Sequence, residues 1–392
     1  MDRPTKQLKN WLLDRLVPAI RISGAGGTAF VANAGHKTVV VDGRAACPLM
    51  DSLIQRNASE RHTHVVIGDV RLGEVVPSNQ VPQRLSWAQF VFSLFFWRRS
   101  DIADFRFLWR IITAPLVGRN RHHHVHMIRS YLVARYFALK FRELAAACDR
   151  VYVICYYDTV MLGVVRAFRL AGKPAWDVQH GNLGPTHDAY NNRRAFMLGS
   201  SFQPTAFLVW SREFGEFVEH TLGAEWESTE YAHLKGFAKA TAAPVGRVTI
   251  LYSLQPETPF PSEVAATMRR FTNVYWLLRP HPRQGALPPD IDCLRTLPNV
   301  AIGSASDPLI SDLQVCSLHI TYNSSVVHEA AASGQPSLFL DPDFIERFSV
   351  EAERGLARFV RPAELIGVLE QLVPGLQCPG SRDVRTAGQN GS

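Results

Sequence analysis

Short apolar runs alternate with stretches of helical periodicity along most of the chain. Among these runs are Lys37-Thr-Val-Val-Val-Asp42, Val151-Tyr-Val-Ile-Cys-Tyr156 and Val274-Tyr-Trp-Leu-Leu278, each the length of one buried strand. The segment from Val160 to Ala171 has the spacing of an amphipathic helix and follows one of these runs directly. Alternation of this kind predicts parallel β-α-β construction, and therefore an α/β fold.

The alternating pattern restarts after a segment of small residues, Ala238-Lys-Ala-Thr-Ala-Ala-Pro-Val-Gly246. A chain of 392 residues is also too long for one ordinary core. We therefore predict two Rossmann-like domains, 1–240 and 241–375. The remaining residues, 376–392, are rich in Gly, Ser and Asn and are predicted to be a disordered tail.

Residues 85–142 break the pattern and are predicted to form a helical insertion in the first domain. They contain ten Lys and Arg against two Asp, so their charge of +8 accounts for the whole net charge of +7. Phe and Trp are also frequent there. Three interpretations are open: a helix pair on an anionic membrane surface, a single-strand nucleic-acid site, or a buried helix pair with arginines facing solvent. We favour a membrane or a polyanionic acceptor over nucleic acid, because no recognised nucleic-acid-binding module accompanies the segment.

Cysteine usage and the N-terminus bear on the compartment. The six cysteines form no Cys-x-x-Cys pair, which favours a reducing environment. The N-terminus shows no signal-peptide pattern, and no apolar run approaches the roughly 20 residues that cross a bilayer. We expect a cytoplasmic protein, or one peripheral on the inner face of the cytoplasmic membrane.

Two polar breaks in the C-terminal half suggest a phosphate site. Arg279-Pro-His-Pro282 closes one apolar run, and Asn323-Ser-Ser-Val-Val-His-Glu329 leads from another into a helix. Hydroxyls and free amides at such a junction favour anions. We predict that Arg279, His281, Ser324 and Ser325 bind phosphate together. The alternative is a proline-rich turn beside an ordinary helix cap.

A polar break in the N-terminal half carries candidate catalytic residues. Asp177-Val-Gln-His-Gly181 ends a predicted strand, and a histidine in that position suits a general base with a pKa near neutrality. His180 is the first candidate, followed by His187, Asp188 and Asp158. The alternative is a hydrogen-bond network that only caps the strand. The run His122-His-His-Val-His126 has no carboxylate or cysteine partner nearby in the sequence, so we assign it to the basic surface rather than to a metal.

The motifs Arg279-Pro-His-Pro282 and Ser324-Ser-Val-Val-His-Glu-Ala-Ala-Ala-Ser-Gly-Gln-Pro336 resemble the C-terminal half of GT-B glycosyltransferases. The pattern is most similar to bacterial surface-polysaccharide enzymes: capsular sialyl- and Kdo-transferases and CDP-glycerol glycerophosphotransferases. Gln179-His-Gly181 also recurs in capsule-type transferases, whereas the Asp-Glu-Gly or Glu-Asp-Gly acceptor motif of many sialyltransferases is absent. The resemblance implies that His281, Ser324 and Ser325 hold the donor phosphate and that Glu329 reaches the ribose.

The resemblance further implies a GT-B fold, with two Rossmann-like domains facing a cleft, and metal-independent chemistry without a cofactor. The expected enzyme moves a sugar from a CMP-, UDP- or CDP-linked donor onto a capsule or lipopolysaccharide glycan, free or lipid-linked. Three alternatives stay open: a sugar-nucleotide epimerase of the same fold, a glycerophosphotransferase, and a non-catalytic factor in glycan assembly.

Overall fold

A computed structural model gives the structure of the chain. It describes residues 11–22, 24–36, 39–70, 73–81, 86–95, 101–106, 109, 121–184, 187, 190, 200–234, 247–256, 258, 260–282, 284 and 286–375. The chain forms two compact units, here called the first and second domains. The first comprises Met1–Lys37 and Arg44–Ala232, and the second Thr38–Gly43 and His233–Ser392. The predicted boundary at 240 and the predicted tail lie outside the described residues.

The first domain is built on a parallel sheet of seven strands in the order β5-β4-β1-β6-β7-β8-β9. The strands are β1 Gly27–Asn33, β4 His62–Ile67, β5 Asn79–Val81, β6 Cys148–Ile154, β7 Ala175–Val178, β8 Ala206–Val209 and β9 Glu225–Ser228. From β1 the chain adds strands in one direction to β5, and from β6 in the other direction to β9.

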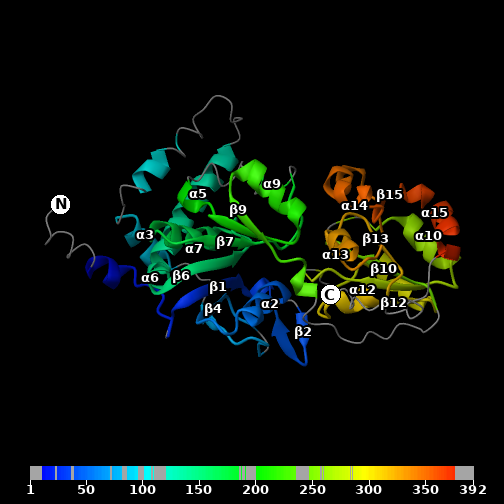
Figure 1. Ribbon diagram of the computed structural model, residues 1–392, viewed down its shortest axis with the longest axis horizontal. Helices are drawn as coiled ribbons and strands as arrows, with labels where there is room; N and C mark the ends of the chain where they lie inside the picture. Colours follow the sequence, from blue (N-terminus) through cyan, green and yellow to red (C-terminus); the bar gives the residue numbers. More distant parts are fainter. Residues whose placement is uncertain are drawn as a thin grey trace, which may run out of the picture. The chain divides into compact units, whose positions relative to one another are not determined.

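Helices cover both faces of this sheet (Figure 1). They are α2 Pro48–Arg56, α3 Trp87–Ser93, α5 Arg121–Lys140, α6 Arg142–Ala147, α7 Thr159–Leu170 and α9 Arg212–Leu222. Because strand side chains alternate between faces, Ala29 and Val31 pack into the core shared with α5 and α7. Phe30 and Ala32 instead pack into the core shared with α2.

The predicted insertion is helical over its described residues. α3, α5 and residues 101–106 form helices, and a further helix covers residues 11–16. The inner side of α5 packs in the core of the domain through Tyr131, Tyr136 and Phe137.

The second domain repeats the architecture with six parallel strands in the order β12-β11-β10-β13-β14-β15. These are β10 Thr249–Ser253, β11 Tyr275–Arg279, β12 Val300–Ile302, β13 Leu318–Thr321, β14 Ser337–Phe339 and β15 Ala357–Phe359. Its helices are α10 Ser262–Arg270, α11 Pro289–Asp292, α12 Leu309–Val315, α13 Val326–Ala332, α14 Ser349–Glu353 and α15 Leu365–Leu372. The direction of strand addition changes between β10 and β13.

Short elements complete the structure. The 3₁₀ helices are η1 Ala34–His36, η2 Ser200–Phe202, η3 Ala232–Leu234, η4 Cys293–Thr296, η5 Pro342–Phe344, η6 Glu346–Phe348, η7 Pro362–Glu364 and η8 Val373–Gly375. β2 Val39–Val41 and β3 Arg44–Ala46 form a separate two-stranded sheet. The apolar run at Lys37–Asp42 is thus not a strand of the main sheet. Within the second domain, Val40 N–H donates to Ser306 O at 2.7 Å.

The predicted α/β fold with two Rossmann-like domains is confirmed. In the described part of the chain, no helix is both long enough and apolar enough to cross a membrane.

Candidate active site

Each sheet has one point at which the order of its strands reverses. In the first domain this point lies between β1 and β6, and in the second between β10 and β13. In open α/β sheets, ligands bind outside the carboxyl ends of the strands at this switch point. The residues that follow β1, β6, β10 and β13 are therefore the first to consider.

At the switch point of the first domain, aromatic and imidazole rings gather around His180. His180 follows β7, and its Nε2 lies 3.1 Å from the hydroxyl of Tyr157, which follows β6. His36, in the 3₁₀ helix after β1, has its ring centroid 6.0 Å from that of His180. The ring of His187 lies tilted against that of Tyr157, with 5.4 Å between centroids. The fold thus brings together two predicted residues, His180 and His187, and adds His36 and Tyr157.

A buried carboxylate holds the loop after β6. Asp177 lies on β7 and accepts hydrogen bonds from Tyr156 N–H at 3.0 Å and from the Tyr190 hydroxyl at 2.8 Å. Burial raises the pKa of Asp177 to about 7. Tyr156 N–H donates to this carboxylate rather than to a neighbouring strand. β6 therefore ends at Ile154, and not at Tyr156 as its apolar pattern predicted. Asp177 therefore positions Tyr157 without facing solvent itself.

The backbone on either side of this cluster is similarly constrained. The buried amide of Gln179 accepts from Trp210 N–H at 2.7 Å and donates to Gly181 O at 2.9 Å, which ties the end of β7 to the end of β8. Cys155 adopts a φ of 62°, a left-handed conformation that is costly for a residue with a side chain. Such strain persists where the surroundings fix the loop, and it is frequent at functional sites.

Burial decides the charge of the imidazoles. It lowers the pKa of His180 to about 3, with smaller contributions from the neighbouring His36 and His187. Burial also lowers the pKa of His36, against the opposing effect of Asp158. The expectation of a pKa near neutrality for His180 is therefore wrong, because partial burial of the ring disfavours its charged form. His180 is a neutral imidazole at neutral pH.

Three polar atoms at this switch point are buried without a hydrogen-bond partner in the described structure: Asn33 Oδ1, His36 Nδ1 and His180 Nδ1. Asn33 ends β1, so all three belong to the same edge of the sheet. Buried polar groups are nearly always paired, so these three atoms have hydrogen-bonding capacity left for a water or a ligand. Sequence reasoning missed Asn33 and His36 because β1, which ends at Asn33, was not predicted as a strand; recognising that strand would have indicated both residues.

The acidic candidates have a different outcome. Asp158 Oδ1 accepts from Val160 N–H at 2.9 Å and from Met161 N–H at 3.4 Å, so it caps α7. Its catalytic role stays a prediction, and the contacts already explain its presence. Asp188 lies outside the described residues.

At the switch point of the second domain lies the predicted Ser-Ser loop. Ser324 is buried, its N–H donates to Thr321 Oγ1 at 3.1 Å, and its hydroxyl accepts from Val326 N–H at 3.3 Å. Ser325 precedes α13, and its hydroxyl makes no hydrogen bond to any described residue. Ser324 therefore shapes the loop, while Ser325 has a hydroxyl available for a ligand.

The Arg279-Pro-His-Pro282 motif lies one strand away, at the end of β11. Arg279 is buried, and its guanidinium pairs with Asp312 on α12 and donates to Asp307 O at 2.6 Å. Because its charge is already balanced, we leave Arg279 out of the proposed phosphate site. His281 is half-buried beyond it, and β10 separates β11 from β13, so His281 lies roughly 10 Å from the Ser-Ser loop.

Glu329, the predicted ribose contact, lies on α13. Its carboxylate lies 3.1 Å from Nε2 of His233, which belongs to the same domain. In the described structure, no group of three or more His, Cys, Asp or Glu side chains could hold a metal ion.

Comparisons with known proteins identify the fold of this chain. No family model and no curated protein matches the sequence. Among solved structures, a putative UDP-N-acetylglucosamine 2-epimerase from Listeria monocytogenes superposes with a TM-score of 0.53 at 13% identity, covering 89% of this chain and 88% of its own. The S. aureus MnaA–UDP co-structure gives 0.54 at 10% identity, with 89% and 88% covered. The calicheamicin glycosyltransferase CalG4 gives 0.51 at 16%, with 89% and 90% covered.

At such identities the similarity concerns the fold. Both kinds of neighbour, glycosyltransferases and sugar-nucleotide epimerases, span nearly the whole chain. The chain therefore has the GT-B glycosyltransferase-like fold, with a switch point in each of its two Rossmann-like domains.

Proposed function

We propose that the protein is a glycosyltransferase that moves a sugar from a nucleotide-activated donor onto a bacterial surface polysaccharide. The observation that carries the proposal is the set of three buried, unpartnered polar atoms on Asn33, His36 and His180 at the switch point of the first domain. These three groups carry no charge, so they suit the hydroxyls of a sugar better than a phosphate. The GT-B fold supplies the second element, a nucleotide-type domain with its own switch point.

The donor is assigned to the second domain. Ser325 offers a free hydroxyl at the switch point, after β13. His281 offers an imidazole after β11, which is separated from β13 by β10. One nucleotide-linked donor can reach both, and their hydrogen bonds would stabilise charge that develops on the departing phosphate. Glu329, held by His233, remains the candidate for the ribose hydroxyls.

The acceptor is assigned to the first domain. His180 Nε2 lies against the Tyr157 hydroxyl, which fixes the orientation of the ring. The acceptor oxygen bonds to the anomeric carbon while the bond to the donor phosphate breaks, and its electron pair leaves with the nucleotide. The His180 ring hydrogen-bonds to the acceptor hydroxyl and orients its oxygen, and the hydroxyl proton is lost to solvent as the new bond forms. His36 and Asn33 would orient the same acceptor.

A thermal-shift screen with CMP, CDP, UDP and GDP tests the donor site. We expect one of them to raise the melting temperature of the wild type, because a ligand that binds only the folded state stabilises it. Ser325→Ala and His281→Ala should each reduce that shift. Ser262→Ala, which removes an exposed serine at the start of α10, is the matched control and should leave the shift unchanged.

The results also separate the alternatives. If no nucleotide stabilises the wild type, a non-catalytic assembly factor becomes the better description. If both site variants keep the full shift, the phosphate site is wrongly assigned.

A sugar-nucleotide epimerase is the second candidate, since the superposed structure from Listeria monocytogenes carries that name. We favour transfer, because the described carboxylates near His180 serve as a helix cap and a buried loop anchor. Formation of an epimeric nucleotide sugar without any acceptor would reverse this choice. We also propose that the enzyme is metal-independent and works in the cytoplasm, where nucleotide-activated donors are available to it.

A further inference from the structure

Large apolar side chains are exposed in one part of the molecule. Of the nine described ones, eight belong to segments 11–16 and 87–125 of the first domain, and the ninth is Ile345 of the second. Five of the eight are aromatic: Trp11, Trp87, Phe92, Phe95 and Trp109. We call these five the aromatic surface. Trp87 is 67% exposed and Phe95 76%, so these are whole rings in water rather than ring edges.

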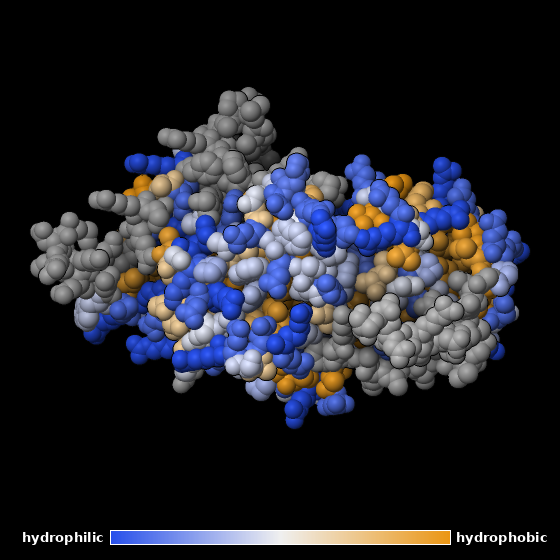
Figure 2. All heavy atoms as spheres, in the orientation of Figure 1, coloured by the Kyte–Doolittle hydropathy of each residue, from blue (hydrophilic) through white to orange (hydrophobic). Residues whose placement is uncertain are grey.

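The segments that carry the aromatic surface pack around one helix, α5. Tyr131 on α5 donates to Asp101 O at 2.8 Å, and Tyr136 on α5 donates to Gln89 on α3 at 3.1 Å. Lys140, the last residue of α5, donates to Pro18 O at 2.7 Å, directly after the helix of residues 11–16. Figure 2 shows single hydrophobic residues between hydrophilic ones over this part of the first domain.

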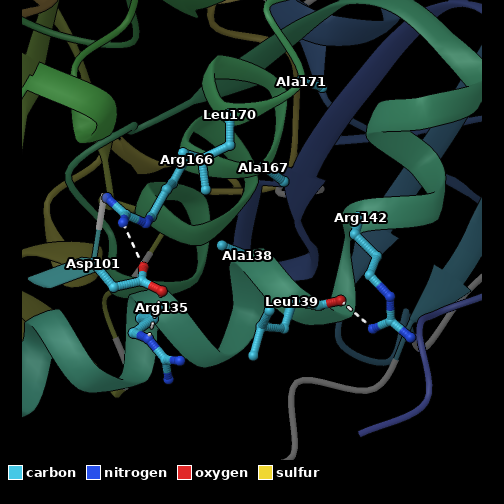
Figure 3. A pocket seen from close by; sticks show the side chains of 9 residues that line it. All are labelled: Asp101, Arg135, Ala138, Leu139, Arg142, Arg166, Ala167, Leu170 and Ala171. Carbon is cyan, nitrogen blue, oxygen red and sulfur yellow. Dashed lines mark hydrogen bonds and ion pairs between the residues drawn. The ribbon is translucent and has the colours of Figure 1, made fainter. Parts of the chain in front are cut away.

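The aromatic surface is exposed although its supporting helices are firmly anchored. The carboxylate of Asp101 lies between Arg135 of α5, at 3.3 Å, and Arg166 of α7, at 2.6 Å, as Figure 3 shows. All three side chains are almost completely buried. A second acid, Asp104, also pairs with Arg166. The buried side of the insertion thus holds it to the core, whereas the rings of the aromatic surface are exposed to solvent.

The same segments are positively charged. Because Asp101 and Asp104 are used by Arg135 and Arg166, the other basic residues of the insertion have no acid of that segment left to balance them. Arg15, Arg106 and Arg129 are exposed, and none has an acidic partner in the described part of the chain. Arg15 instead lies over the Trp11 ring, 5.4 Å from its centroid.

We infer that the aromatic surface and its arginines dock the first domain onto an anionic lipid bilayer. Trp and Phe rings enter the interface between head groups and acyl chains, while arginines bind the lipid phosphates. The structure extends this surface beyond the insertion, to the helix of residues 11–16. The inference rests on the proposed function only in that a membrane would place the enzyme beside a lipid-linked or surface glycan.

Vesicle sedimentation of the full chain tests this inference without donor or acceptor. We expect binding to phosphatidylcholine vesicles that contain about one third phosphatidylglycerol, and much weaker binding to pure phosphatidylcholine. The double variant Trp87→Ser/Phe95→Ser should lose roughly tenfold or more in partition coefficient. Ile345→Ser, which removes the exposed apolar residue of the second domain, is the matched control and should bind as the wild type does.

The charge is tested separately. Arg106→Gln should weaken binding about fivefold, whereas Arg358→Gln, an exposed arginine of the second domain, should not. Equal binding by all variants, or no binding of the wild type to anionic vesicles, would overturn the inference. So would dimerisation through the aromatic surface, seen as a wild-type dimer in sedimentation velocity that Trp87→Ser/Phe95→Ser converts to a monomer. A nucleotide-induced thermal shift measured on the same samples reports on the proposed function independently.

Discussion

His36, His180 and His187 lie close to Tyr157, and burial lowers the pKa of both His36 and His180. A histidine in water would be charged below about pH 6.5, whereas the pKa of His180 is lowered to about 3. A neutral ring offers one donor and one acceptor, which suits a sugar hydroxyl. At the residue scale, the site of the first domain is therefore a hydrogen-bonding site for uncharged groups.

Replacement of His180 by Ala should lower the rate of sugar transfer by about a hundredfold, because it removes the ring proposed to orient the acceptor hydroxyl. Nucleotide binding should be unchanged, since the proposed donor site lies in the other domain. Initial rates and a nucleotide thermal shift measure the two effects. His220→Ala, an exposed histidine on α9, serves as the control. A His180→Ala enzyme with full activity would remove His180 from the mechanism.

The pH profile of the wild type checks the same assignment. Since the pKa of His180 in the folded protein is about 3, the ring stays neutral at every pH above about 5. Activity should therefore not fall as the pH drops through 6.5. A loss of activity centred there, absent from His180→Gln, would show that the ring is charged in that range.

At the scale of single elements, the insertion is organised around α5. α5 presents Tyr131, Tyr136 and Phe137 to the core, and the hydroxyls of the two tyrosines donate to residues 101–106 and to α3. Asp101 joins α5 to α7 across this contact. Composition could predict helices here, but it could not separate the buried Arg135 from the exposed Arg129, since both lie in one segment of sequence.

Asp101→Asn should destabilise the first domain by about 3–5 kcal/mol, because two buried guanidinium groups would lose their shared carboxylate. The free energy of unfolding in urea measures the loss. Asp14→Asn breaks the exposed pair with Arg142 and should cost about 1 kcal/mol or less. Similar losses in the two variants would mean that Asp101 does not hold the insertion.

Across the whole molecule, each domain has a core of its own. β1, α5 and α7 contribute to the first, and β10, α10 and α15 to the second. Short edge strands escaped prediction in the first domain: β5 and β9 are polar and partly exposed, so they lack the apolar pattern of a central strand. They are strands because a neighbouring strand supplies their hydrogen bonds.

Nucleotide binding should stabilise one domain more than the other. In calorimetry, a saturating nucleotide at about one hundred times its Kd should add about 2.7 kcal/mol to the domain that binds it. We expect that gain in the transition that Leu278→Ala lowers, because Leu278 is buried in the core of the second domain. A gain confined to the transition that Val153→Ala lowers would place the nucleotide in the first domain instead.

The sequence by itself determined the α/β class, the two Rossmann-like halves and most central strands, because burial on both faces leaves a readable apolar run. It also located the Ser-Ser loop and His180, since polar residues directly after such runs mark strand ends. Only the tertiary structure decided which of these groups are available to a ligand. Asp312 neutralises Arg279, Asp158 caps a helix, and His36 comes to lie beside His180. Those outcomes depend on partners distant in sequence, and on burial, which sets the charge of each group.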